Sequence, residues 1–244
     1  MRVGPCLDYD QVASDYARYR DAQPFVVETL RHLQALSPGG ATLEVGCGAG
    51  AYICALARYG PGTRFGMDAS RRMLEQAPQR ARIAFVQGHA TRLPFADRSL
   101  DMIFSVNVVH HIENVAAYFG ESFRVLRPDG ISCTATDSEA IIARREPLSR
   151  YWPATVPIEL SRYHAIEKLR DAMTAAGFGG IEQWHRHARF AVSDSAPYRH
   201  RAFSCLRLIA EDEFARGLRD MEADLSAGPV PGNSELVFLW GRHP

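Results

Sequence analysis

The sequence of 244 residues has no excess of charge, because 28 lysine and arginine side chains balance 28 aspartates and glutamates. Proteins that bind nucleic acids or anionic membranes electrostatically need a clustered positive surface, so the balance argues against both as partners. Lysine itself is almost missing, since Lys168 is the only one. Cationic contacts are therefore left almost entirely to arginine, whose guanidinium is planar and permanently charged.

Paired cysteines and long apolar runs are missing as well. The five cysteines are scattered, odd in number and without a Cys-x-x-Cys pair, which predicts reduced thiols and neither a metal site nor a disulfide framework. No apolar run reaches the length of about 18 residues that a membrane span needs. The first residues lack the charged segment and apolar stretch of a secretory signal. We therefore expect a cytoplasmic protein.

Short strands alternate with helices through the first half of the chain. This rhythm is typical of βαβ units, and it predicts an α/β fold with a parallel sheet and helices on both faces. Helical spacing of apolar residues begins at Tyr9 and again at Pro24, ahead of the first strand. The predicted strands are 42–45, 64–67, 83–87, 100–106 and 131–136, and helices are predicted after the first, second and fourth of them, with 127–130 as a turn into the fifth.

The alternation breaks after Asp137. The stretch 138–161 carries three prolines, an arginine group and aromatic residues that look exposed, and we interpret it as an insertion over the sheet. Beyond it, the pattern predicts a helix over 162–176 and two last strands, 181–189 and 236–240, with mostly helical structure over 190–228. We expect one domain, 1–244, with a helical lid at 1–37, a cofactor-binding core at 38–137, and caps at 138–161 and 190–228.

A glycine-rich loop follows the first predicted strand. Gly46, Gly48 and Gly50 lie in Glu-Val-Gly-Cys-Gly-Ala-Gly, and glycines are needed where a chain turns at positive φ or where a ligand lies against bare backbone. The segment also fits the dinucleotide pattern G-x-G-x-x-G/A. Asp68, at the end of the next strand, suits a ribose hydroxyl with either kind of cofactor. The loop alone therefore leaves a nicotinamide dehydrogenase open.

Five ordered segments together resemble the class I S-adenosylmethionine-dependent methyltransferases, closest to the branch of quinone-biosynthesis and natural-product enzymes. The resemblance implies a Rossmann-like sheet of seven strands, mostly parallel with an antiparallel last strand, and a helical cap. It implies S-adenosylmethionine as cofactor and S-adenosylhomocysteine as product. The segments are EVGCGAG (44–50), GMDAS (66–70), GHATRLPF (88–95), FSVNVVHHI (104–112) and RVLRPDG (124–130).

The same resemblance implies the cofactor contacts. The glycine loop would underlie the methionyl part, the carboxylate after the second strand would accept from the ribose, and the residues that follow it would flank the adenine. The first helix would fold over the site, with Arg20 as a candidate partner of the cofactor carboxylate. The implied set is Tyr9, Tyr16, Arg20, Glu44, Gly46, Cys47, Gly48, Gly50, Asp68, Ala69, Ser70, Met73, Gly88, His89, Ala90, Ser105 and Val106.

One position departs from the family pattern. The family usually has an aspartate that accepts from the adenine amino group where this chain has His89, between Gly88 and Ala90. Two interpretations stay open. A neutral imidazole nitrogen can accept in place of the aspartate, or the ring points to solvent and the backbone at Ala90 makes the adenine contact.

Three polar residues are candidates for the chemistry. Asn107, His110 and His111 follow the fourth strand, at the sheet edge where open α/β folds bind ligands. Histidine suits a general base, so we hypothesise that His110 or His111 assists proton removal or orients the acceptor. The alternative is a structural role in capping the next loop.

The caps indicate what kind of acceptor is expected. Their aromatic side chains suit an aromatic or polycyclic small molecule. Four arginines are candidates to pair with a carboxylate or phosphate on it: Arg144, Arg145, Arg199 and Arg201.

Other functions are separated by specific residues. Amino-methylases of nucleic acids carry a [DN]-P-P-[YF] tetrad, and the matching place here reads Asn-Val-Val-His at 107–110, which argues against a nucleic-acid substrate. A member of the family that binds the cofactor without transferring methyl, as a cyclase or a regulatory binding module, would keep the same motifs and stays open. The sequence does not indicate an oligomeric state.

Overall fold

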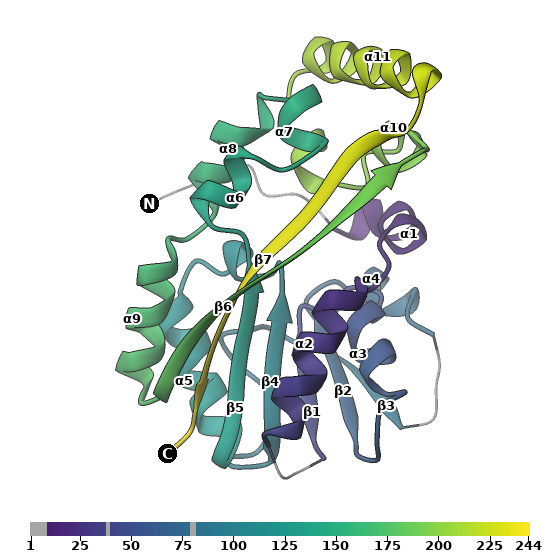
Figure 1. Ribbon diagram of the computed structural model, residues 1–244. Coiled ribbons are helices and arrows are strands. Elements are labelled where there is room, and N and C mark those ends of the chain that lie inside the picture. Colours follow the sequence, from purple (N-terminus) through teal and green to yellow (C-terminus); the bar gives the residue numbers. More distant parts are fainter. Residues whose placement is uncertain (1–8, 38–39, 79–81) are drawn as a thin grey trace.

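A seven-stranded sheet forms the centre of the computed structural model, which describes residues 9–37, 40–78 and 82–244 (Figure 1). Its order is β3-β2-β1-β4-β5-β7-β6. Neighbours from β3 to β5 pair in parallel, whereas β7 is antiparallel to both β5 and β6. The predicted fold class is thus confirmed, including the antiparallel last strand. The strands are β1 (Thr42–Val45), β2 (Arg64–Asp68), β3 (Ile83–Gln87), β4 (Leu100–Val106), β5 (Leu126–Thr136), β6 (Gly179–Val192) and β7 (Val230–Arg242).

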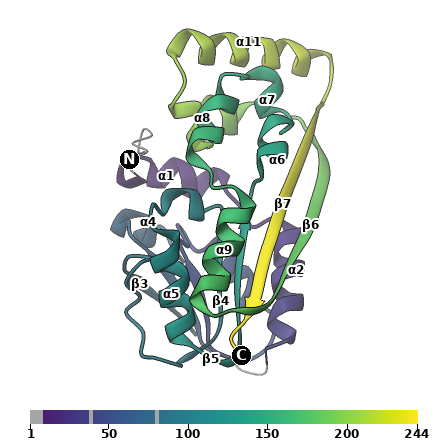
Figure 2. The ribbon, with the colours of Figure 1, turned by 90° about the vertical axis from the view of Figure 1, so that its left-hand side faces the viewer.

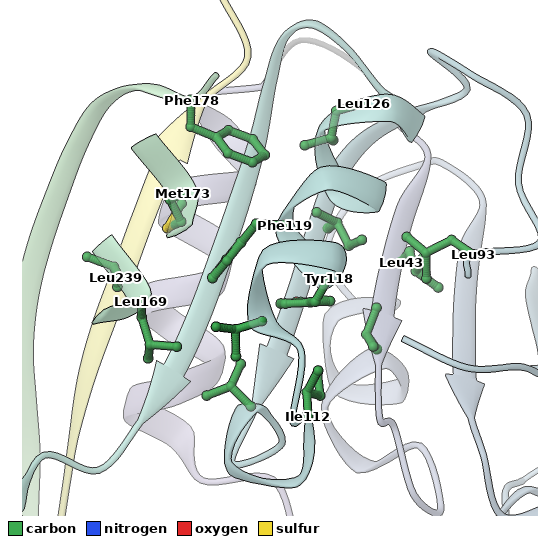
Figure 3. Packing of buried hydrophobic residues seen from close by; sticks show 14 of the residues in the cluster. Leu43, Leu93, Ile112, Tyr118, Phe119, Leu126, Leu169, Met173, Phe178 and Leu239 are labelled. Carbon is green, nitrogen blue, oxygen red and sulfur yellow. The ribbon is translucent and has the colours of Figure 1, made fainter. Parts of the chain in front are cut away.

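Helices cover both faces of the sheet. On one face α2 (Pro24–Ala35) and α3 (Ala51–Leu56) pack on Met102, Phe104 and Val106 of β4. On the other, α5 (Val115–Val125) and α9 (Ile166–Ala176) pack together in a cluster that includes the alternate residue Ile103, and Figure 3 shows Phe119 of α5 beside Leu169 and Met173 of α9. Strand β4 is buried on both faces because successive side chains of a strand point to opposite sides. No described helix is long and apolar enough to cross a membrane.

A cap lies over the carboxyl edge of the parallel strands (Figures 1 and 2). Its own apolar core is centred on Trp152, whose indole Nε1 donates to the carbonyl oxygen of Phe214 at 3.0 Å. The aromatic residues Tyr151 and Trp152, which look exposed in the sequence, are buried there. The cap helices are α6 (Glu139–Ala143), α7 (Leu148–Tyr151), α8 (Thr155–Arg162), α10 (Ala196–Arg199), the short 3-10 turn η2 (Ser204–Arg207) and α11 (Glu211–Ala227).

The last two strands are much longer than their sequence pattern predicts. They pair from Gly179 and Arg242 up to Val192 and Val230, so a two-stranded ribbon joins the sheet to the cap (Figure 1). Most β6 side chains are exposed or half-buried, which explains why hydrophobic alternation marks only 181–189 and 236–240. The turn predicted over 127–130 is also different, because β5 already begins at Leu126, with a shift of register against β4.

The described part of the predicted lid contains two helices, α1 (Tyr9–Tyr19) and α2. Helix α1 packs on α4 (Arg71–Glu75), where Val12, Ala13 and Met73 form a small apolar cluster. Helix α2 belongs to the sheet face instead, so only α1 is placed to cover a site. Residues 1–8 of the predicted lid, and 38–39 at its junction with the core, lie outside the described residues.

Candidate functional site

Two cavities adjoin at the carboxyl ends of β1, β2 and β4. The smaller has a volume of about 180 Å³ and extends toward Asp68, Met73 and His89. The larger, of about 450 Å³, extends under the cap toward Asp137 and Phe190. Both are lined by the same central group of residues: Tyr9, Tyr16, Gly46, Gly48, Val106 and Asn107.

The glycine loop forms the boundary between the cavities. Gly46 has a φ of 68° and Gly48 a φ of 53°, in the left-handed region that side chains disfavour. A Cβ on Gly46 would also collide with the side chain of Val108. Glycine is therefore required at Gly46 by conformation and by space, and bare backbone faces both cavities.

The side chain of Asp68, the last residue of β2, is hydrogen-bonded to the glycine loop. Its Oδ2 accepts from the backbone N–H of Gly48 at 2.8 Å and its Oδ1 from that of Ser70 at 2.9 Å. Burial raises the pKa of this carboxyl group. Asp68 lines the smaller cavity, so one carboxylate both shapes the loop and faces the space beside it.

Two more residues predicted for cofactor binding, Glu44 in β1 and Cys47 in the glycine loop, line the larger cavity. Glu44 is buried, and its Oε2 accepts from the backbone N–H of Ile53 at 2.8 Å, at the start of α3. Burial raises the pKa of the Glu44 carboxyl and of the Cys47 thiol. Cys47 is therefore a protonated thiol and a poor nucleophile.

Helix α1 brings three predicted residues over the cavities. The Tyr9 hydroxyl and His111 Nε2 lie 2.9 Å apart. The Arg20 guanidinium lies 5.4 Å from the ring centre of Tyr16 and 5.1 Å from that of Phe203. Within the part of the chain that the structure describes, no carboxylate forms an ion pair with Arg20, so this cation in the larger cavity is available to an anionic ligand group.

The segment with His89 lies at the far end of the smaller cavity. Gly88, His89 and Ala90 all line it, together with Ala69 and Met73 of the α4 region. His89 Nδ1 is 2.9 Å from the hydroxyl of Thr91. The imidazole is thus oriented by a neighbour while it borders the cavity, and both interpretations of its role stay open.

Three predicted cofactor residues line neither cavity. Ser105 is fully buried, and its hydroxyl binds those of Thr134 and Tyr118 on the α5 side of the sheet, because strand alternation turns it away from the face of Val106. Ser70 caps α4 by accepting from the Met73 N–H at 3.1 Å, and Gly50 serves as the left-handed N-cap of α3. These three residues therefore have structural roles in the fold, and a cofactor contact for them stays a prediction.

Asn107 lies where the two cavities meet. It has a φ of 54°, and its backbone N–H donates to the Ala135 carbonyl at 2.8 Å. Its side-chain Oδ1 is buried and has no hydrogen-bond partner. A buried amide oxygen without a partner is costly, so this atom is suited to accept from a ligand.

The two histidines after β4 differ in their surroundings. The ring of His110 stacks on Tyr163 with centres 4.1 Å apart, lines the larger cavity, and leaves its buried Nδ1 without a partner. His111 lines the smaller cavity beside Tyr9. Burial lowers the pKa of His111 to about 4 and that of His110 well below its ordinary value. Both rings are therefore neutral at physiological pH.

This burial predicts a stability loss in acid. In the unfolded chain both imidazoles take up a proton near pH 6.5, whereas the folded protein binds these protons only at lower pH. The free energy of unfolding should therefore fall as the pH drops below about 6.5, by up to about 1.4 kcal/mol per pH unit for the His110 ring and by less for His111, whose exposed side chain is screened by solvent. Urea unfolding of wild type and H110N at pH 7 and pH 5 measures it. Between pH 7 and pH 5, H110N should lose less stability than wild type. The control H187N, changed at an exposed position of β6, should lose as much stability as wild type.

A buried ion network that the sequence interpretation missed borders the larger cavity. Arg145 Nη1 lies 3.0 Å from Asp137 Oδ2 and 3.2 Å from Glu159 Oε2, and Arg162 Nη1 lies 2.7 Å from Glu159 Oε1. Burial raises the pKa of Asp137 to about 6. The sequence contains one indication that Asp137 lies at the site. Asp137 directly follows β5, just as Asp68 is the last residue of β2.

The arginines predicted to bind an anion on the acceptor are paired with carboxylates of the protein instead. Arg144 Nη2 donates to both oxygens of Glu235 at 2.8 Å. Arg145 belongs to the buried network, Arg199 pairs with Glu222, and Arg201 pairs with Glu211 while stacking on Phe214. Their charges are therefore already balanced within the fold.

Comparison with known proteins places these features in context. Residues 43–134 match the family model described as a methyltransferase domain. The chain is 28% identical over 174 residues to the malonyl-[acyl-carrier protein] O-methyltransferase of Marinomonas sp. (strain MWYL1), a match that covers 69% of this chain and 63% of that protein. The chain thus spans less than two thirds of this relative's length.

Solved structures share the fold. A candidate methyltransferase from an antibiotic biosynthesis pathway of Anabaena variabilis ATCC 29413 has a TM-score of 0.70 at 21% identity, covering 93% of this chain and 99% of that chain. The phosphoethanolamine N-methyltransferase 2 of Haemonchus contortus, in complex with S-adenosyl-L-methionine, has a TM-score of 0.65 at 17% identity, covering 96% of this chain and 57% of that one. At such identities the likeness concerns the fold alone.

Proposed function

The chain belongs to the class I S-adenosylmethionine-dependent methyltransferases, and on that premise we propose that it transfers the methyl group of S-adenosylmethionine to a small-molecule acceptor. The observation that carries the proposal is the meeting of two cavities at the glycine loop. One suits the nucleoside part of the cofactor. The other is large enough for the amino-acid part together with an acceptor.

The residues around the smaller cavity fit the nucleoside. The Asp68 carboxylate would accept from the ribose hydroxyls, while Met73 and the backbone of 88–90 would enclose the adenine. The bare backbone at Gly46 and Gly48 would underlie the methionyl part, and Arg20 would pair with its carboxylate. The fit rests on two features of this chain: positive-φ glycines that leave space, and a cation without a carboxylate partner among the described residues.

When bound, the cofactor supplies an electrophilic methyl group on a positively charged sulfur. The task of the protein is then to orient the acceptor and to exclude water. Asn107 Oδ1 and His110 Nδ1 are buried, lack partners and border the larger cavity. We assign them to the O–H or N–H group of the acceptor. Burial keeps His110 neutral but also lowers its pKa, which makes it a weak base, so we assign it mainly to orienting the acceptor by a hydrogen bond.

The walls of the larger cavity support a hydrophobic acceptor. Apolar and aromatic side chains come from the cap and from the β6–β7 ribbon, as is usual for small-molecule sites. The named relatives act on small or carrier-bound molecules, among them malonyl-[acyl-carrier protein] and sterols. The side chains concerned are Leu148, Tyr163, Phe190, Tyr198, Phe203 and Leu236.

The proposal predicts cofactor binding and methyl transfer. S-adenosylhomocysteine should bind at one site per chain in a calorimetric titration, whereas NADH should not bind. Incubation with methyl-labelled S-adenosylmethionine and a small-molecule extract should then yield a labelled product. Absence of S-adenosylhomocysteine binding would contradict the proposal. Binding without any labelled product would instead indicate a family member that does not transfer methyl.

A further inference from the structure

Three consecutive charged residues enter the cap just after α6, and only one lacks a counter-charge. Arg144 is balanced by Glu235, and Arg145 by the buried network. Glu146 lines the larger cavity, and its carboxyl Oε2 is buried without a hydrogen-bond partner. Within the described ranges, no ion pair involves Glu146.

The backbone of Glu146 is held rigidly by the β6–β7 ribbon. Its N–H donates to the side-chain Oδ1 of Asn233 at 3.0 Å, and the Asn233 N–H donates to the Glu146 carbonyl at 3.0 Å. The Asn233 side chain also donates to the carbonyl of Arg144 at 3.1 Å. The segment therefore has little freedom to move Glu146 into water.

The balance of charge around this carboxylate is negative. Asp21 and Asp194 also line the larger cavity, and neither forms an ion pair among the described residues. The cations among its lining residues are Arg20 and Arg145, of which one is proposed for the cofactor carboxylate and the other is shared between two protein carboxylates. A buried carboxylate oxygen without a partner is unfavourable, and a cationic ligand group would supply the missing partner.

We propose that the acceptor carries a cationic nitrogen on a hydrophobic body, and that Glu146 is the specificity-determining residue that binds this nitrogen. The inference deepens the proposed function and rests on it. Leu148, Phe190 and Leu236 contribute apolar walls to the same cavity and hold the body of the ligand. The sign of the recognised charge is thus opposite to that expected from the arginines in the sequence.

Three probes of similar shape test the inference: phenethylamine, phenethyl alcohol and phenylacetate. Each is titrated calorimetrically into the protein with and without saturating S-adenosylhomocysteine. Phenethylamine should bind about tenfold more tightly than the alcohol, as a charge-assisted hydrogen bond allows, and phenylacetate should bind weakest. E146Q should bring the amine and the alcohol to within about twofold. E146D should keep the preference, and so should the matched control E139Q, changed at the exposed start of α6.

A melting experiment separates recognition from a structural role. Because E146Q replaces a half-buried carboxyl group, whose buried Oε2 has no hydrogen-bond partner, by an uncharged group of nearly the same shape, it should melt at or above the wild-type temperature while losing the amine preference. Tightest binding of phenylacetate, or an amine preference that survives in E146Q, would overturn the inference. If S-adenosylhomocysteine binds normally and the preference is absent, this inference fails alone. If S-adenosylhomocysteine does not bind, the proposed function fails.

Discussion

Replacing Asp68 by alanine is expected to weaken S-adenosylhomocysteine binding by about 10²- to 10³-fold. A hydrogen bond to a charged group contributes about 1.5–3 kcal/mol, and the proposed ribose contact uses two hydroxyls. The same carboxylate accepts from the N–H groups of Gly48 and Ser70, so its removal also loosens the loop. Calorimetric titration of wild type and D68A measures the ratio of dissociation constants.

Two further variants define what the loss at Asp68 means. D97A removes an exposed carboxylate that pairs with Arg124 away from both cavities, and it should bind S-adenosylhomocysteine like wild type. D68N keeps one acceptor oxygen and should lose less affinity than D68A. Binding of D68A within threefold of wild type, with an unchanged melting temperature, would show that Asp68 does not contact the ligand.

Replacing Arg145 by methionine is expected to lower the free energy of unfolding by about 3–5 kcal/mol, the usual cost of breaking a buried ion pair. The side chains of Arg145, Asp137 and Glu159 are 14%, 7% and 3% exposed. In R145M, Glu159 would still form its ion pair with Arg162. The carboxylate left without a partner would therefore be that of Asp137. For a chain of this size the melting temperature should fall by on the order of 10 °C, measured by calorimetry or urea unfolding at pH 8.

The pH dependence identifies the cause of that loss. Asp137 has a pKa of about 6 in the folded protein, so the folded state binds its proton more tightly than the unfolded chain. Its contribution to stability therefore falls as the pH rises from about 4 to about 6. Without Arg145 the pKa of Asp137 should rise further, and the cost of R145M should be smaller at pH 5 than at pH 8.

Matched variants test the network itself. R145M combined with D137N should recover much of the lost stability, because the unpaired charge is gone. R144M should cost at most about 1 kcal/mol, since the side chain of Arg144 is 60% exposed in its pair with Glu235. Equal losses in R144M and R145M, independent of pH, would show that burial of this network has no special role.

The proposed cofactor half of the site follows closely from local sequence. Gly46, Gly48 and Asp68 directly follow strands or end them, and parallel strands bring their carboxyl ends to one edge of the sheet. Such contacts can be predicted from the sequence once the strands are located correctly. The family resemblance also implies Ser105 and Ser70 as site residues, and strand alternation and helix capping account for their positions in the fold.

The proposed acceptor half depends on residues far apart in the chain. Arg144 meets Glu235 across 91 positions, and Asn233 fixes Glu146 across 87. These pairings arise because the β6–β7 ribbon extends beyond the strands that hydrophobic alternation marks. Local hydrophobic patterns predict which face of a strand or helix is buried against the sheet. They do not predict which distant carboxylate will form an ion pair with an arginine.

The sequence by itself determined that the protein has no excess charge, that it would use arginine in place of lysine, and that a glycine loop and a carboxylate would end two neighbouring parallel strands. Each of these depends on composition or on short-range geometry. Only the tertiary structure decided which charges remain unpaired. In the folded protein the cap arginines pair with carboxylates, while Arg20 and Glu146 have no ionic partners among the described residues. The reason is that net charge is a sum over the chain, whereas ion pairing depends on the distance between charges after folding.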